Sequence, residues 1–215
     1  MLFRSNDTAT TEIYTACYTL SLHDALPISV KRVTKVKLAQ TPTLFRFSVV
    51  TLVTLSTVIS MQLYFLRHGE ADWLDWKKSD DERPLTDFGK KEMRDVAKFL
   101  ARLNVRVNLI VTSPLPRASQ TAEIAADYLK AKLRKDESLA PGFGMSELRT
   151  VLKRHHAKAL MLVGHEPDFT TVISGLTDAS LKLAKAGVAL VDVDPESEEG
   201  RLLWLFPPKI ARKAK

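Results

Sequence analysis

A short apolar segment that ends in arginine, histidine and glycine places the strongest constraint on the fold of this chain. Residues 63–66 are Leu-Tyr-Phe-Leu, and Arg67, His68 and Gly69 follow them directly. An apolar run of this length before a glycine turn is typical of a buried strand that leads into a tight loop. Open α/β sheets hold ligands at the carboxyl ends of their strands, so Arg67 and His68 are candidates for an anion site. If this tripeptide is considered alone, the alternative interpretation is that it places an ordinary surface charge after a core strand.

Two further apolar runs, residues 107–111 and 159–163, are each followed by a charged or titratable residue and a helix signal. Arg117 stands after two prolines, at the start of an alanine-rich helix that we expect to continue to Leu133. A helix amino terminus already favours an anion. His165 follows the other run, and Pro167 fits the first position of the next helix. The alternative for Arg117 alone is an arginine that merely solvates the start of its helix, and the alternative for His165 alone is a core histidine held by hydrogen bonds.

The remaining pattern predicts an α/β fold. Thr86 is a good helix cap, and one buried stripe is expected on its helix. The stripe consists of Met93, Val96, Leu100 and Leu103. Residues 146–156 predict another helix with Ser146 as its cap, and residues 188–193 and 202–206 predict a hairpin. We therefore expect a three-layer sandwich with helices on both faces of a mostly parallel central sheet that ends in an antiparallel hairpin.

Composition excludes several classes of function. The chain has 215 residues, 45% hydrophobic and 27% charged, as expected for a globular protein. Its formal charge of +7 includes a basic tail at residues 209–215, but no aromatic residues interleave with the tail, so nucleic-acid binding is not expected. Cys17 is the only cysteine, so the part of the chain after residue 60 cannot be a phosphatase that uses a cysteine nucleophile. His155 and His156 are adjacent, point apart on a helix and are expected at the surface.

The first 60 residues differ from the rest. Residues 1–29 resemble the translation of sequencing-adapter DNA and are set aside as non-native. Residues 30–60 are basic and then apolar, like a signal peptide, but their apolar part is too short to span a membrane. We expect translated upstream DNA with the true start at Met61, and a real signal or anchor is the alternative. The expected domain covers residues 61–208, in a protein that is cytoplasmic and does not bind a membrane.

Four motifs occur in an order that resembles the histidine phosphatase superfamily, also called phosphoglycerate mutase-like. They are LRHGEA at 66–71, RPLTDFG at 83–89, TSPLPRASQTA at 112–122 and VGHEPDF at 163–169. The resemblance extends from Met61 to about Phe206. The short chain and the lack of an inserted helical domain are most similar to the SixA-type phosphohistidine phosphatases.

The resemblance implies that His68 is a nucleophile that forms a phosphohistidine intermediate, which water then hydrolyses. Arg67, Arg117 and His165 would hold the phosphoryl oxygens. A neutral imidazole is a competent nucleophile near neutral pH, and fixed cations stabilise the charge of a transferring phosphoryl group. We therefore predict that the reaction needs no metal and no cofactor.

The proton donor and the remaining substrate contacts are less constrained. Many members of the family place an acid directly after the second histidine, which is Glu166 here, and other branches use a later loop, where Glu147 is the nearby candidate. A phosphohistidine substrate has an imidazole leaving group, which reduces the need for a strong acid. Arg83 and Glu70 are candidates for substrate binding. A solvated loop arginine and a carboxylate that only orients its loop are the alternatives.

These inferences converge on a metal-independent phosphatase, expected to act on phosphohistidine in a protein. A phosphatase of a small phosphate ester or sugar phosphate on the same fold is the first alternative. A non-catalytic phosphate-binding module is the second. Short loops around the expected site favour a protein substrate, which needs an open rim. The expected partner is thus a phosphorylated protein or, in the first alternative, a small phosphorylated metabolite.

Overall fold

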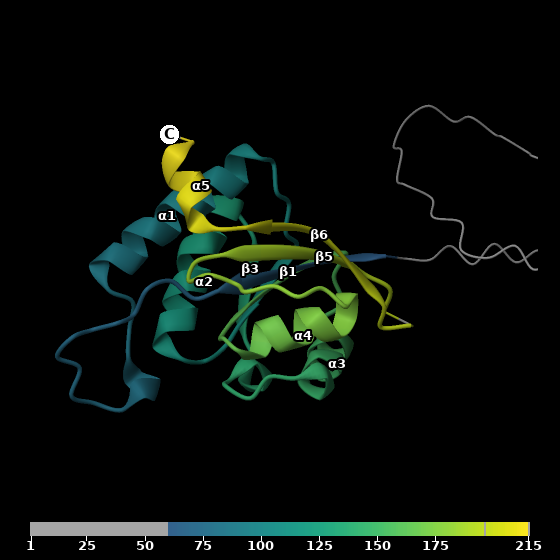
Figure 1. Cartoon of the computed structure of the whole chain (residues 1–215), viewed down its shortest axis with the longest axis horizontal. Helices are drawn as coiled ribbons and strands as arrows, with labels where there is room; N and C mark the ends of the chain where they lie inside the picture. Colours follow the sequence, from purple (N-terminus) through teal and green to yellow (C-terminus); the bar gives the residue numbers. More distant parts are fainter. Residues whose placement is uncertain (1–59, 196, 215) are drawn as a thin grey trace, which may run out of the picture. The chain divides into compact units, whose positions relative to one another are not determined.

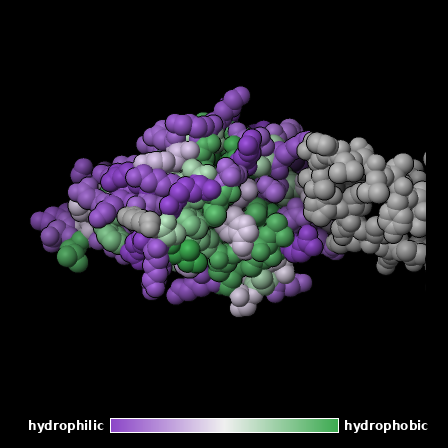
Figure 2. Space-filling model, turned by 90° about the horizontal axis from the view of Figure 1, so that it is seen from above, coloured by the Kyte–Doolittle hydropathy of each residue, from purple (hydrophilic) through white to green (hydrophobic). Residues whose placement is uncertain are grey.

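The computed structural model describes residues 60–195 and 197–214. The predictions for residues 1–59 lie outside the described residues, and the division of the chain into leader, domain and tail stays a prediction. Within the described ranges, no helix is both long and apolar enough to cross a membrane. Hydrophilic residues cover much of the face of the domain that is visible in Figure 2, and smaller hydrophobic groups lie between them.

The centre of the domain is one six-stranded sheet of order β3-β2-β4-β1-β5-β6 (Figure 1). The strands are β1 (Met61–Arg67), β2 (Leu109–Thr112), β3 (Lys132–Lys135), β4 (Ala159–Gly164), β5 (Val188–Val193) and β6 (Gly200–Phe206). Strands β1 to β4 are parallel, whereas β5 is antiparallel to both β1 and β6. The predicted mostly parallel sheet with an antiparallel hairpin at its end is confirmed.

Helices cover both faces of the sheet, which confirms the predicted three layers (Figure 1). One face packs against α1 (Asp87–Arg102), α2 (Pro116–Leu129) and α5 (Pro208–Lys213), and the other against α3 (Met145–Arg154) and α4 (Asp168–Thr177). Two short 3-10 helices are η1 (Asp80–Glu82) and η2 (Glu137–Leu139). Because side chains alternate along a strand, β1 contributes to both cores. Leu63 and Phe65 join the core with α3 and α4, and Tyr64 and Leu66 join the other.

Helix α1 begins where the sequence predicts. Thr86 is its N-cap, and the Thr86 hydroxyl accepts a hydrogen bond of 3.0 Å from the Gly89 N–H. Met93, Val96 and Leu100 form the expected buried stripe. Leu103 does not, because α1 ends at Arg102 and the Leu103 side chain is 57% exposed.

Four predicted boundaries are wrong. Helix α2 stops at Leu129, not Leu133, because Lys130 takes a left-handed conformation and the chain then forms the polar edge strand β3. Helix α3 starts at Met145 behind the cap Gly144, so Ser146 lies inside the helix. Pro167 precedes α4 as its cap instead of occupying the first helical position. The second predicted strand begins at residue 109 rather than 107.

One prediction of an exposed residue is wrong, and the basic tail is partly folded. His155 is not a surface residue, because its side chain is 10% exposed and its Nε2 lies 2.8 Å from Oδ2 of the buried Asp136. Asp136 also accepts two hydrogen bonds from Arg154, at 2.7 and 2.8 Å. The basic tail forms most of α5, and Arg212 there lies 3.3 Å from Glu92 of α1. The tail is therefore partly anchored to the domain.

Candidate active site

The sheet order brings together the four residues that the sequence singles out. Arg67 ends β1 and His68 follows it, while His165 follows the neighbouring strand β4. Arg117 is the second residue of α2, which follows β2 on the other side of β4. The rings of His68 and His165 have centroids 5.2 Å apart. The four side chains thus meet at one edge of the parallel sheet, where such folds bind ligands.

His68 is held as a neutral imidazole in one tautomer. Its Nδ1 lies 2.7 Å from the Gly69 carbonyl oxygen, which can only accept, so Nδ1 carries the proton and Nε2 carries the lone pair. Burial, helped by the charges of Arg117 and Arg67, lowers the pKa of His68 from 6.5 to about 4, against the opposing effect of the Gly69 carbonyl. An unprotonated Nε2 at neutral pH is what a nucleophilic histidine requires.

His165 is also buried and neutral. Its Nε2 lies 2.8 Å from the hydroxyl oxygen of Ser113, which follows β2, and its Nδ1 has no partner. Burial, followed by the effects of His68 and the arginines, lowers the pKa of His165 to about 3. Ser113 was not predicted as a site residue. It lies within the motif at residues 112–122, but an uncharged serine after a strand does not by itself indicate a functional residue.

Arg117 is nearly inaccessible to solvent and contacts a loop residue that the sequence did not indicate. Its side chain is 6% exposed, and one terminal nitrogen donates to the backbone oxygen of Asp80 at 2.8 Å. The other terminal nitrogen lies 3.3 Å from the Asp80 carboxylate. The same carboxylate lies 2.7 Å from Arg83, whose side chain is 25% exposed. Asp80, at the start of η1, therefore holds both arginines with one exposed side chain.

Arg67 and the two candidate proton donors have different surroundings. Arg67 donates to the Leu183 carbonyl at 2.9 Å. Burial raises the pKa of Glu166, while Thr170 and the charge of Arg67 oppose the rise, and its Oε1 is buried without a partner. Glu147 instead accepts the Gly144 N–H at 3.0 Å and so caps α3. Of the two acids, Glu166 has the surroundings of a proton donor.

The loop after His68 is fixed to α1 and α2, and the Gly69 N–H donates to the Thr121 hydroxyl of α2 at 3.0 Å. The Glu70 carboxylate accepts the Asp72 N–H at 3.0 Å and also the Thr86 hydroxyl, and the Glu70 backbone oxygen accepts the Thr86 N–H at 3.0 Å. A Cβ at Gly89 would lie 2.1 Å from that same backbone oxygen, so only glycine permits this approach. The Glu70 side chain therefore orients the loop, which agrees with one of its two predicted roles.

All buried side-chain nitrogen and oxygen atoms without a hydrogen-bond partner, within the described ranges, belong to predicted site residues. They are Arg67 Nε, Arg83 Nε, Arg117 Nε, His165 Nδ1 and Glu166 Oε1. An unpaired buried polar group costs about 1–3 kcal/mol, so such a concentration is unusual for a purely structural region. The same ranges contain no group of three or more His, Cys, Asp or Glu residues that could hold a metal ion.

Comparisons with known proteins identify similar chains. Residues 63–144 match the family model of the histidine phosphatase superfamily (branch 1). An uncharacterized protein of Picosynechococcus sp. is 40% identical over 137 residues, which are 60% of this chain and 82% of that protein. The phosphohistidine phosphatase SixA of Escherichia coli is 28% identical over 162 residues, covering 72% of this chain and 99% of SixA. The structure of a protein histidine phosphatase SixA complexed with tungstate has a TM-score of 0.62 and 28% identity, covering 70% of this chain and 99% of that one.

Proposed function

The chain belongs to the histidine phosphatase superfamily, and from this premise we propose that it removes phosphoryl groups from phosphohistidine in proteins, with His68 as the nucleophile. The phosphatase class follows from the family. The protein substrate, the covalent intermediate and a cytoplasmic site of action are the parts that we propose. The resemblance to SixA over nearly its whole length supports the choice of phosphohistidine.

One observation carries the proposal: the cluster of buried donors without partners. The Nε groups of Arg67, Arg83 and Arg117 are donors, and the Nδ1 of His165 can donate when its Nε2 accepts from Ser113. A phosphoryl group offers three acceptor oxygens with negative charge, which complements these donors. The tungstate in the related SixA structure is an oxyanion as well. The site is therefore suited to a phosphoryl group.

The first chemical step transfers the phosphoryl group to the protein. The Nε2 lone pair of His68 forms a bond to phosphorus while the bond from phosphorus to the substrate imidazole nitrogen breaks. The departing nitrogen takes a proton, for which Glu166 is our candidate because burial raises its pKa. In the second step, a water oxygen bonds to phosphorus, the bond to Nε2 breaks, the proton that the water gives up returns to Glu166, and inorganic phosphate leaves.

The arginines supply the electrostatic part of catalysis. A pair of unit charges about 4 Å apart interacts by about 4 kcal/mol at an effective dielectric constant near 20. Arg67 and Arg117 are both at least partly withdrawn from solvent, so their charges are less screened than those of surface residues. Two such cations account for a large part of a phosphoryl-transfer rate without a metal. Activity that EDTA removes and Mg²⁺ restores would contradict this account.

The test compares His68→Ala with the matched variant His156→Ala, which removes an exposed histidine. We expect His68→Ala to lose hydrolysis of both a phosphohistidine peptide and a chromogenic phosphate ester, and His156→Ala to keep both. Mass spectrometry without acid treatment, carried out during turnover, should detect one phosphoryl group on the wild type and on His156→Ala, and none on His68→Ala. Unchanged turnover in His68→Ala would refute the nucleophile, and phosphate binding without any turnover by the wild type would favour a binding module. Preference for a sugar phosphate over the peptide would favour the small-ester alternative.

A further inference from the structure

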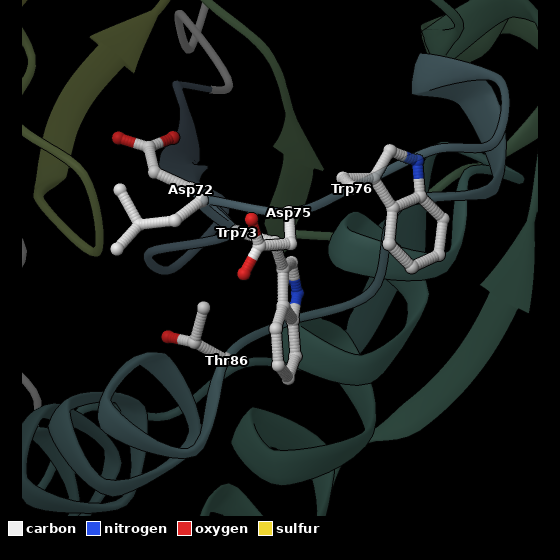
Figure 3. Close-up of a pocket in the computed structure, with 6 residues that line it drawn as sticks. Asp72, Trp73, Asp75, Trp76 and Thr86 are labelled. Atoms are coloured by element: carbon white, nitrogen blue, oxygen red, sulfur yellow. The ribbon is translucent and has the colours of Figure 1, made fainter.

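A cavity with an acidic and aromatic lining lies beside the candidate active site. It has a volume of about 380 Å³ and is lined by Asp72, Trp73, Leu74, Asp75, Trp76 and Thr86 (Figure 3). The lining belongs mainly to the loop that follows the motif of His68. Neither the phosphoryl-transfer mechanism nor the family resemblance uses this loop, so its chemistry needs a separate account.

The cavity offers hydrogen-bond acceptors and aromatic faces but few donors. The Trp73 indole N–H donates to the Pro84 carbonyl at 2.9 Å, and the Trp76 indole N–H donates to the Ser79 carbonyl at 2.8 Å. Both rings are thus fixed in orientation by bonds within the loop, and their N–H groups are not available to a ligand. The Thr86 hydroxyl donates to Glu70. The polar groups that remain in the lining are therefore the carboxylates of the two aspartates.

The two aspartates differ in how far their charges are compensated. Asp72 pairs with Lys185 and also lies 4.0 Å from Arg83. Asp75 is exposed, and among the described residues it has no hydrogen bond or ion pair. None of the six lining residues is basic. A carboxylate without a partner in a cavity that two indole rings also line favours a cation, through charge attraction and the cation–π interaction.

The cavity is close enough to His68 to contact the same substrate molecule. The Asp72 backbone N–H donates to the Glu70 carboxylate, and Glu70 is two residues from His68 in the loop. Asp72 also lies 4.0 Å from Arg83, whose buried Nε is one of the unpaired donors of the candidate site. A cationic group in the cavity would therefore stand beside the phosphoryl group that His68 receives.

We propose that this cavity binds a lysine or arginine side chain of the phosphorylated protein, near in sequence to the phosphohistidine, an inference that rests on the proposed function. A long aliphatic stem with a charged end suits the chemistry of the cavity, because the stem can lie along the tryptophan rings while the charge meets Asp75. The loop would then contribute to the choice among phosphoproteins, separately from the phosphoryl-binding arginines.

The test uses phosphohistidine peptides that carry lysine, norleucine or glutamate at successive positions on either side of the phosphorylated residue. At one position, we expect kcat/KM for the lysine peptide to exceed that for the norleucine peptide about fivefold, as for an exposed charge contact supported by an aromatic face. Asp75→Asn should remove this preference, and Asp75→Lys should reverse it in favour of glutamate. Glu82→Gln, which removes one charge from the same loop outside the cavity, should keep it. All three variants should hydrolyse a chromogenic phosphate ester like the wild type.

Binding of the same peptides to His68→Ala, measured by calorimetry, separates this inference from the proposed function. Hydrolysis without any lysine preference, or a preference that Asp75→Asn leaves unchanged, would overturn the cavity proposal and leave the phosphatase activity standing. Lysine-dependent binding that Asp75→Asn removes, without hydrolysis by the wild type, would support the cavity and refute the substrate. Binding of n-butylamine with no lysine preference among the peptides would indicate a site for free amines and overturn the proposal.

Discussion

We expect Asp80 to compete with the phosphoryl group of the substrate for Arg117, so that Asp80→Asn makes phosphate binding stronger. In the structure the Asp80 carboxylate lies 3.3 Å from one nitrogen of Arg117 and 2.7 Å from Arg83. A phosphoryl group that uses either guanidinium group must displace this carboxylate or share the arginines with it. Asparagine keeps the side-chain shape and the backbone carbonyl that accepts from Arg117 at 2.8 Å, so the substitution removes only the charge.

The size of the effect follows from the exposure of Asp80. Its side chain is 62% exposed, so each of its ion pairs belongs to the weak, solvent-screened class worth about 0.2–1 kcal/mol. Together the two pairs contribute about 1 kcal/mol, which corresponds to about a fivefold change in a binding constant. The inhibition constant of inorganic phosphate against a chromogenic ester should therefore fall about fivefold in Asp80→Asn at low ionic strength. The difference should shrink as salt is added.

The control is Glu82→Gln, which removes one negative charge from the same 3-10 helix. Among the described residues, the only ion pair of Glu82 is with Lys78, at 4.0 Å, so Glu82→Gln should leave the inhibition constant unchanged. Weaker phosphate binding in Asp80→Asn would show that Asp80 positions Arg117 rather than competing for it. An equal change in both variants would show a general effect of loop charge. Either result would refute the competition.

Three further predictions concern stability. The free energy of unfolding should rise with pH up to about 6.5, because the unfolded state binds protons at His165 and His68 below that pH, while burial in the folded state lowers the pKa of His165 to about 3 and that of His68 to about 4. In urea unfolding, His165→Asn should make the rise between pH 5 and 7.5 less steep, because only the contribution of His68 remains, and an unchanged slope would contradict the assignment. Gly89→Ala should cost about 2 kcal/mol, since its Cβ would meet the Glu70 backbone oxygen at 2.1 Å, whereas Gly175→Ala, with no atom nearer than 3.8 Å, should change the thermal midpoint little; equal midpoints would argue against the close approach. Asp136→Asn should lower the free energy of unfolding by about 3 kcal/mol in denaturant at pH 7. Burial alone would raise the pKa of Asp136, but hydrogen bonds with the Ser138 N–H, His155 and Arg154 outweigh it and lower that pKa to about 2. The stabilisation should therefore be present above pH 4 and disappear towards pH 2, and a cost that does not depend on pH would refute it.

The positions of the candidate site residues could be predicted because each one follows a recognisable strand or starts a helix. Apolar runs and glycine or proline turns place Arg67, His68, Arg117 and His165 at the ends of strands, and parallel strands bring those ends together. The sequence pattern contains this information locally. Only the sheet order, which depends on packing across the whole domain, had to be supplied by the structure.

The features that sequence could not predict depend on contacts between distant segments. Strand β3 is Lys-Leu-Arg-Lys, and such a polar edge strand has no apolar run to identify it. His155 is largely withdrawn from solvent and contacts Asp136, which lies 19 residues earlier in the chain. Asp80 reaches Arg117 across 37 residues, and nothing in a charged loop indicates which of its aspartates will do so.

The position of β1 within the sheet has a consequence for folding during synthesis. The strand that leads to His68 is paired with β4, about 100 residues later, and with β5, about 125 residues later. Its side chains also complete both cores, so neither core can close until those later strands have left the ribosome. Contacts of such long sequence separation slow folding and leave apolar strands unpaired meanwhile. The segment with His68 is therefore made before its partner strands, and chains that stop before β5 should leave β1 with an open edge and aggregate.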